Sequence, residues 1–214
     1  MSLYPKNLNE YVAGMGIPRG PKSKAFLVDT VNGDDDNPGT TWQSPLKTIA
    51  AAEDLCTGEQ HDTVLWIPGD TADTVAATIA WDKDHTHLVG IGAQFPGIGQ
   101  RCRLASSVAA PALTISGRGG IFKNFQVQNT YAGASGGTLV SGPYNYFEGV
   151  YFNGMNDASS ANKSTSYCLT VSGAENYFKR CTVGSVQLAM SSTNAPLIVS
   201  AGANTFEECR IQHY

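Results

Sequence analysis

One motif occurs four times between Ile115 and Ile211, and it constrains the fold more than any other feature of this chain. Each copy has a serine, a phenylalanine six residues later, and apolar residues or a cysteine at the third and fifth positions after that phenylalanine. The phenylalanines are Phe122, Phe147, Phe178 and Phe206. Their separations of 25, 31 and 28 residues show a segment of fixed length alternating with a connection of variable length, which is typical of stacked repeats.

The composition of the copies favours strands over helices. They are short runs of aromatic and β-branched residues separated by glycine and asparagine, whereas helical repeats need apolar residues at i, i+3, i+4 and i+7 over long segments. We therefore predict an all-β solenoid of about five coils. The four phenylalanines should form its core stack, spaced about 4.8 Å apart.

Positions on either side of each phenylalanine predict how the coils hold together. Two residues before it stand Asn145, Asn176 and Asn204 in three copies, and we expect their amides to bond along the stack at a turn. The residue after it alternates in charge through Lys123, Glu148, Lys179 and Glu207. We interpret these carboxylates as partners in outward ion pairs rather than as catalytic groups.

Two further columns of outward positions are partly apolar. The first outer column comprises Ile121, Tyr146 and Tyr177, and the second contains Leu139 and Ile198, interspersed with threonines. An apolar strip along a rod suits packing against other protomers. We predict that these five residues are contacts in a homotrimer.

The N-terminal part of the chain divides into two segments ahead of the solenoid, which should occupy residues 63–214. Residues 1–25 are rich in proline, glycine and lysine and show no usable period, so we expect an extended arm that becomes ordered on another surface; a frayed terminus is the alternative. Residues 26–62 should contain a strand and an amphipathic helix over Ser44–Gly58, with Ser44 as N-cap and Pro45 at the first helical position. The arm residues expected to bind a partner are Tyr4, Lys6, Tyr11, Arg19, Lys22 and Lys24.

Three stretches resemble a known superfamily. They are Val31-Asn-Gly-Asp-Asp-Asp-Asn-Pro-Gly-Thr40, Ser44-Pro-Leu-Lys-Thr-Ile-Ala50 and Thr63-Val-Leu-Trp-Ile-Pro-Gly69. The sequence resembles the opening of right-handed parallel β-helix proteins of the pectate-lyase-like superfamily. The resemblance implies a first strand, a capping helix and a first coil ending in Pro-Gly. It implies no single activity, because the superfamily includes lyases, hydrolases, adhesins and virus spikes.

Composition and local motifs exclude or disfavour several functions. A net charge of −4 without a basic stripe argues against nucleic-acid binding, and no apolar run is long enough to span a membrane. Five cysteines without a C-x-x-C pair favour neither a disulfide framework nor structural zinc. We interpret the aspartate-rich loop 32–39 as a turn rather than a calcium site, and His85 and His87 as an exposed strand end rather than metal ligands. No cofactor is expected.

These observations predict a non-enzymatic virion protein of a tailed bacteriophage, made in the host cytoplasm. The resemblance implies that phage spikes, fibres and capsid decoration proteins use such helices as trimers. With few coils, a decoration or cement protein bound to the major capsid protein through its N-terminal arm is favoured over a tail spike or fibre. The alternative is a glycan-binding or polysaccharide-degrading β-helix, with Trp81, Tyr144 and Tyr151 lining a groove and Asp70, Asp73, Asp82 or Asp84 as acids.

Overall fold

The chain folds mostly into short strands of two to five residues. The computed structural model describes residues 7–70, 72–92, 102–158, 165–185 and 194–212. The seven-stranded sheet contains, in spatial order, β1 (Ala25–Asp29), β2 (Thr63–Ile67), β5 (His87–Gly90), β8 (Ile121–Lys123), β11 (Tyr146–Glu148), β14 (Tyr177–Lys179) and β17 (Thr205–Glu207). The six-stranded sheet contains β18 (Arg210–Ile211), β15 (Thr182–Val183), β12 (Tyr151–Met155), β9 (Gln126–Asn129), β6 (Arg103–Ser106) and β3 (Asp73–Val75). The five-stranded sheet contains β16 (Ala195–Val199), β13 (Tyr167–Val171), β10 (Gly136–Val140), β7 (Leu113–Ile115) and β4 (Ile79–Trp81).

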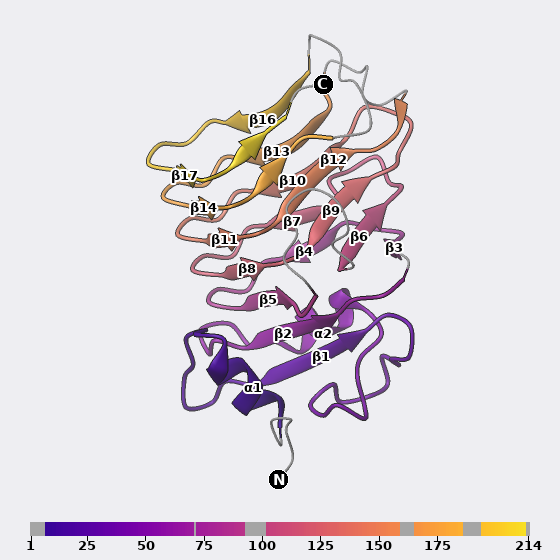
Figure 1. The fold of residues 1–214 in the computed structure, drawn as a ribbon, viewed down its shortest axis with the longest axis vertical. Coiled ribbons are helices and arrows are strands. Elements are labelled where there is room, and N and C mark those ends of the chain that lie inside the picture. The colour runs from indigo at the N-terminus through magenta and orange to yellow at the C-terminus, as the bar shows by residue number, and fades with distance from the viewer. Residues whose placement is uncertain (1–6, 71, 93–101, 159–164, 186–193, 213–214) are drawn as a thin grey trace.

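Successive strands enter the three sheets in turn, and the pairs between them are parallel. Figure 1 shows the strands stacked along the long axis from the N-terminal to the C-terminal end. The predicted parallel β-helix is therefore confirmed. Strands β5 to β16 make four regular turns, so the coil count differs slightly from the expected five; β2 to β4 precede them under the cap, and β17 and β18 start another turn.

The core stack lies where the repeat predicts it. Phe122, Phe147, Phe178 and Phe206 are in register on the seven-stranded sheet. Ring centroids of the first two are 5.0 Å apart, and the next two spacings are 4.5 Å each with nearly parallel planes. Offset stacking of this kind adds about 0.5–1.5 kcal/mol per pair beyond area burial. The first three rings are fully buried, and Phe206 at the C-terminal end is partly exposed.

A left-handed residue explains why the inward positions follow each phenylalanine at three and five residues rather than at two and four. The residue two positions after each phenylalanine has a positive φ: 59° at Asn124, 62° at Gly149, 50° at Arg180 and 52° at Glu208. This conformation costs little for glycine and asparagine but strains arginine and glutamate. It bends the chain between the seven-stranded and six-stranded sheets, so that alternation restarts after the corner.

The asparagines form the expected ladder. The side-chain oxygens of Asn145, Asn176 and Asn204 accept the backbone N–H of Gly120, Asn145 and Asn176 at 2.8, 2.9 and 2.9 Å. Their amide nitrogens donate to turn carbonyls. Asn145 and Asn176 are buried, so these bonds satisfy backbone groups that water cannot reach.

The capping helix α2 (Ile49–Leu55) is shorter than predicted. Its N-cap is Thr48, whose hydroxyl accepts the N–H of Ala51 at 3.1 Å; the prediction of Ser44 as N-cap was wrong. Leu46 instead continues as extended chain, because its N–H and C=O bond Leu27 and Asp29 of β1. Buried residues of α2 join the interior of the solenoid, so its predicted capping role is confirmed.

The N-terminal segment is not an extended arm over the residues that the structure describes. Residues Leu8–Gly14 form helix α1, capped by Asn7, whose side chain accepts the N–H of Glu10. Leu8, Val12 and Ile17 are buried against the outer face of β1, β2 and β5 (Figure 1). The segment therefore folds on its own chain, because an amphipathic turn of helix covers apolar side chains that those strands point outward. No helix among the described residues is long and apolar enough to cross a membrane.

Candidate functional site

The outer face of the seven-stranded sheet has a covered part and an open part. On the covered part, Leu27, Leu65 and Val89 point outward from β1, β2 and β5 and pack against α1 and the chain after it. From β8 onward the same column continues as Lys123, Glu148, Lys179 and Glu207. The change from apolar to charged residues coincides with the end of the cover.

The first outer column lies beside these charges on the open part. Ile121, Tyr146 and Tyr177 are in register on adjacent strands and half-buried. The two tyrosine rings stack with centroids 5.9 Å apart and planes 21° apart. The ammonium of Lys123 lies 5.5 Å from the centre of the Tyr146 ring, within the range of a cation–π contact. The three side chains form one continuous strip.

The charged residues pair along the stack as predicted. Lys123 Nζ lies 3.1 Å from Glu148 Oε2, and Lys179 Nζ lies 2.9 Å from Glu207 Oε1. Arg180 also pairs with Glu148. Partial burial alone would raise the pKa of Glu148, but hydrogen bonds and ion pairs with Lys123 and Arg180 lower it below the usual value. Glu148 is therefore ionised near neutral pH, which suits an ion-pair partner and not a proton donor.

The second outer column lies on a different sheet. Thr114, Leu139, Thr170 and Ile198 are in register on β7, β10, β13 and β16 of the five-stranded sheet. The first three are half-buried and Ile198 is 40% exposed. The two columns that the sequence predicts as protomer contacts thus exist, and they occupy two separate faces of the rod.

Three of the six predicted arm residues, Tyr11, Arg19 and Lys24, contact the rest of the chain. Tyr11 packs edge-to-face on Trp42 with centroids 5.5 Å apart. The Arg19 guanidinium donates to Asn9 and to Ser23. The backbone C=O of Lys24 accepts the N–H of Thr63 at 2.9 Å. The side chains of Lys22 and Lys24 remain exposed, whereas Tyr4 and Lys6 lie outside the described residues.

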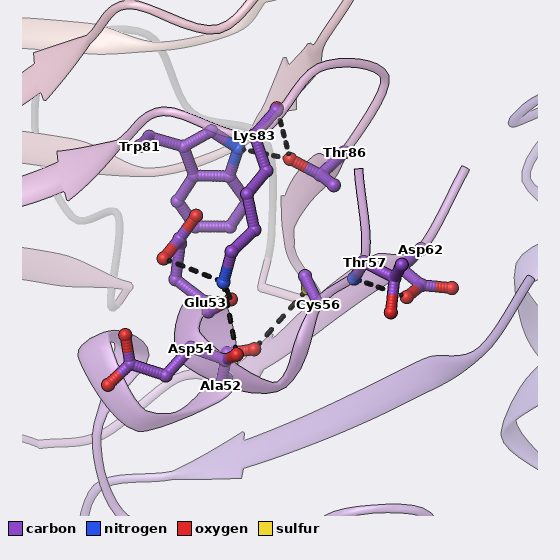
Figure 2. Close-up of polar contacts among 9 residues, drawn as sticks. All are labelled: Ala52, Glu53, Asp54, Cys56, Thr57, Asp62, Trp81, Lys83 and Thr86. Atoms are coloured by element: carbon purple, nitrogen blue, oxygen red, sulfur yellow. Dashed lines mark hydrogen bonds and ion pairs between the residues drawn. The ribbon is translucent and has the colours of Figure 1, made fainter. Parts of the chain in front are cut away.

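Beneath the cap, the buried carboxylate of Glu53 pairs with the half-buried ammonium of Lys83. This pair holds α2 in place. Figure 2 shows Lys83 pointing from the turn after β4 to the C-terminal end of α2. Its Nζ lies 3.0 Å from the C=O of Asp54 and 3.3 Å from Glu53 Oε2. Burial raises the pKa of Glu53. Because cations near a helix C-terminus satisfy its last carbonyls, we interpret the pair as stabilising the position of α2.

Three histidines gather at the start of β5, where the sequence predicted an exposed strand end. His87 is fully buried, so that interpretation was wrong for it. Its Nδ1 accepts the N–H of Ile121 at 3.1 Å, and its Nε2 lies 3.2 Å from Nδ1 of His61. His85 Nδ1 lies 2.8 Å from Glu59 Oε2. Burial, then the neighbouring His61 and His85, lower the pKa of His87 to about 3.

The acids named for the enzyme alternative do not meet at one place. Asp84 pairs with Arg118 at 3.0 Å. Asp73 occupies the inward register position next to Leu104, and burial, then the charge of Asp35, raise its pKa to about 6. Asp70 and Asp82 lie in turns on either side of β3 and β4. Among the described residues, no group of three or more histidines, cysteines or acids could hold a metal ion.

Two of the three aromatics predicted to line a glycan groove are buried. Trp81 donates from Nε1 to Thr86 Oγ1 at 2.8 Å and is buried (Figure 2). Tyr151 is buried as well. Tyr144 is 58% exposed at the turn before β11. Trp81 belongs to the interior cluster, whereas Tyr151 is in register with Gln126 and Thr182 and is buried outside that cluster.

Comparison with known proteins identifies the fold and no sequence family. No family model and no curated protein matches the chain. Among solved structures, pectate lyase Pel9A aligns with a TM-score of 0.62 and 16% identity over 92% of this chain and 48% of its own. A rhamnogalacturonan lyase aligns at 0.54 and 14%, over 88% and 51%. ORF18 of Geobacillus virus E2 aligns at 0.50 and 12%, over 94% and 43%.

These similarities cover almost the whole chain at identities that establish architecture alone. The chain spans about half the length of the solved structures it matches. Together with the three parallel sheets and the capping helix, they confirm the fold that the three sequence stretches implied. The chain has the parallel β-helix architecture shared by pectin-active enzymes and a phage protein.

Proposed function

We propose that the chain is a non-enzymatic structural protein of a phage virion, forms a homotrimer and decorates the capsid. The observation that carries this proposal is the pair of outer columns. Each is in register along the rod and partly apolar, and the two lie on different sheets. A monomer would expose both partly apolar strips to solvent, whereas contacts between protomers would cover them.

Two different contact faces are what a ring of three protomers needs. In a cyclic trimer each interface is heterologous, so one patch of a protomer meets a different patch of the next. In our proposal the first outer column of one protomer packs on the second outer column of its neighbour. The stacked tyrosines supply large rigid area, and Leu139 and Ile198 supply the apolar partners.

A structural role is further supported by the positions of the charged groups. Glu148 and Glu207 are held in ion pairs along the open face, and Glu53 is held under the cap. These carboxylates already serve the fold. The solved phage protein of the same architecture makes a virion location a natural setting for such a rod.

Capsid binding needs a different attachment element from the whole arm, because residues 8–17 are part of the fold. We assign it to the basic residues Lys6, Lys22 and Lys24, of which Lys22 and Lys24 expose their side chains. Lys22→Glu with Lys24→Glu should weaken binding to purified capsids at low salt, since surface ion pairs are screened by salt. Equal binding by this variant and the unaltered chain would refute the assignment.

Light scattering on the purified chain tests the trimer. The expected mass is three times the chain mass of 22.7 kDa. Ile198→Lys or Tyr177→Lys should shift the mass toward one chain, because each places a charge in an apolar contact. Leu55→Lys, on the exposed side of α2 at 45% exposure, is the matched control and should leave the mass unchanged. A monodisperse monomer for the unaltered chain would overturn the proposal.

The alternative of a glycan-binding or polysaccharide-degrading protein is favoured by one observation. Tyr146 and Tyr177 stack on the open face, and Tyr144 is exposed close by in sequence; aromatic faces of this kind can bind sugar rings. Incubation with acidic and neutral polysaccharides, followed by a reducing-end assay, separates the two functions. Turnover that is lost in Asp82→Asn or Asp84→Asn would establish the enzyme.

A further inference from the structure

Two cysteines occupy adjacent positions of one inner column at the C-terminal end of the solenoid. Cys181 and Cys209 each stand three residues after a core phenylalanine, at the corner before β15 and β18. The following residues pair in register, Thr182 with Arg210 and Val183 with Ile211. In-register neighbours on parallel strands lie about 4.8 Å apart at their backbones, within the separation that a disulfide spans.

The backbones on either side of the two cysteines are hydrogen-bonded, because the N–H of Arg210 donates to the C=O of Cys181 at 2.9 Å. Cys209 Sγ lies 3.3 Å from the C=O of Phe178, and Cys181 Sγ lies 3.4 Å from the C=O of Lys179. Both sulfurs therefore lie at the same corner, on backbones whose spacing a disulfide can span.

The environment of the two sulfurs differs in a way that suits oxidation. Cys209 belongs to the last described turn and is partly exposed, whereas Cys181 is buried beneath it. The hydrogen bond from Cys181 lowers the pKa of Cys209 to about 7, so a large part of it is thiolate at neutral pH. Burial raises the pKa of Cys181 well above its usual range. The Cys209 sulfur is thus an accessible nucleophile. The Cys181 sulfur is a neighbour that can attack Cys209 once it is oxidised.

The other three cysteines lack these features. Cys56, Cys102 and Cys168 are buried. Burial raises the pKa of Cys102 to about 11 and of Cys168 to about 12. The sulfurs of Cys56 and Cys102 donate to backbone carbonyls in the interior. They serve as internal controls within the same molecule.

We propose that Cys181 and Cys209 form a reversible disulfide when the protein meets a peroxide, and that this bond links β18 to β15 in the last turn that the structure describes. The Cys209 thiolate attacks one peroxide oxygen; the O–O bond breaks, giving a sulfenic acid and hydroxide, which takes up a proton. The Cys181 sulfur then attacks the Cys209 sulfur, the S–O bond breaks, and a second water leaves with the Cys181 proton. Two thiols and one hydrogen peroxide give one disulfide and two waters.

The last turn is the place where such a bond would change behaviour. Strand β18 pairs on one side with β15 and has no further strand beyond it in the sheet that the structure describes. Terminal repeats of a solenoid fray most easily because they have one neighbour. A covalent link across the last pair of strands closes a loop of 27 residues between the cysteines and should suppress this fraying.

Treatment of the reduced protein with hydrogen peroxide tests the proposal. Thiols are then alkylated in denaturant, and peptides are mapped by mass. The expected result is loss of two of the five thiols, a cross-linked peptide containing Cys181 and Cys209 lighter by about 2 Da, and recovery on adding dithiothreitol. Digestion near residues 200–212 should slow several-fold in the oxidised form. Five remaining thiols, a different pairing, or a link between two molecules would overturn it.

Cysteine variants separate proximity from general oxidation. Cys181→Val places in the column the residue that Val150 supplies one turn earlier, so folding should survive. In this variant Cys209 should accumulate as sulfenic acid that a dimedone probe traps, and no cross-link should form. Cys168→Ala is the matched control and should retain the cross-link at its usual yield. A cross-link in Cys181→Val, or its loss in Cys168→Ala, would contradict the assignment.

Discussion

The two ends of the solenoid bury their apolar residues to different degrees. At the N-terminal end α2 covers the interior and α1 covers the outer face, so Val28, Trp66 and Leu27 are almost completely buried. At the C-terminal end Val199 is 44% exposed and Ile211 is 53% exposed, although the residues one turn earlier, Val171 and Val183, are fully buried. Burial in a solenoid is thus decided by what lies above and below a residue rather than by the residue itself.

The largest expected effect compares a central and a terminal ring of the core stack. Phe178→Ala should cost about 3–5 kcal/mol of unfolding free energy, because a fully buried ring leaves a cavity between two neighbours. Phe206→Ala should cost less than half as much, since its ring is partly exposed and stacks on one side. Denaturant titration of both variants measures the difference. A loss below about 1 kcal/mol for Phe178→Ala would refute its inward position.

The next effect concerns acid and the covered end. The pKa of His87 is about 3 in the folded chain against 6.5 usually, so the unfolded chain binds more protons between these values and stability falls as pH drops through this window. Between pH 7 and pH 5 the contribution of His87 to this loss should be roughly 2 kcal/mol. Protonation of Asp73, whose pKa is raised to about 6, acts in the opposite direction over the same range and offsets part of the loss. The groups facing His87 are His61 and, beyond it, His85 with Glu59.

Denaturant titrations at several pH values measure this loss. His87→Gln keeps an acceptor for the N–H of Ile121 and removes the titration, so its stability should fall less than that of the unaltered chain from pH 7 to pH 5. Hydrogen exchange should show β5 and β8 opening before β14 in acid. Below pH 4.5 the carboxylates with lowered pKa, Glu59 and Glu148, add their own acid sensitivity. An unchanged pH dependence in the variant would exclude His87 as the cause.

The smallest effect compares two steps of the asparagine ladder. Asn176→Ala removes the acceptor for the N–H of Asn145 and leaves that group buried, at an expected cost of about 1–2 kcal/mol. Asn204→Ala removes the equivalent bond to Asn176 at the half-exposed end, where water can replace it. Thermal unfolding of both variants measures the difference. Equal losses would show that the last turn is as well protected as the centre.

Prediction from sequence succeeded where spacing is local. The register of the seven-stranded sheet follows from two local features. Each serine stands six residues before a phenylalanine, and in three copies an asparagine stands two residues before that phenylalanine. The two outer columns followed from the same register. The protomer contacts assigned to them stay a proposal, since register says which residues are aligned and not what they contact.

Prediction failed where a residue's neighbour comes from another part of the chain. Helix α1 had a local signal in Asn7 as N-cap and in the i, i+4 pair Leu8 and Val12, but the many glycines and prolines around it obscured the pattern. Tyr151 and His87 occupy outward register positions, in line with Gln126 and Ile121, and no local pattern signals that they are buried there. Their burial depends on packing that only the assembled coils provide.

The sequence by itself therefore determined the repeat, the stacked interior and the charge pairing, since each depends on an interval repeated along one chain. Only the tertiary structure decided how the ends are treated: α1 folds back on β1, β2 and β5, and Cys209 lies partly exposed above Cys181. The physical reason is that a residue in the middle of a column is buried by the equivalent residues of the turns above and below it. At the ends of the described turns one of these neighbours is absent. Burial there depends on which other segment of the chain covers the position.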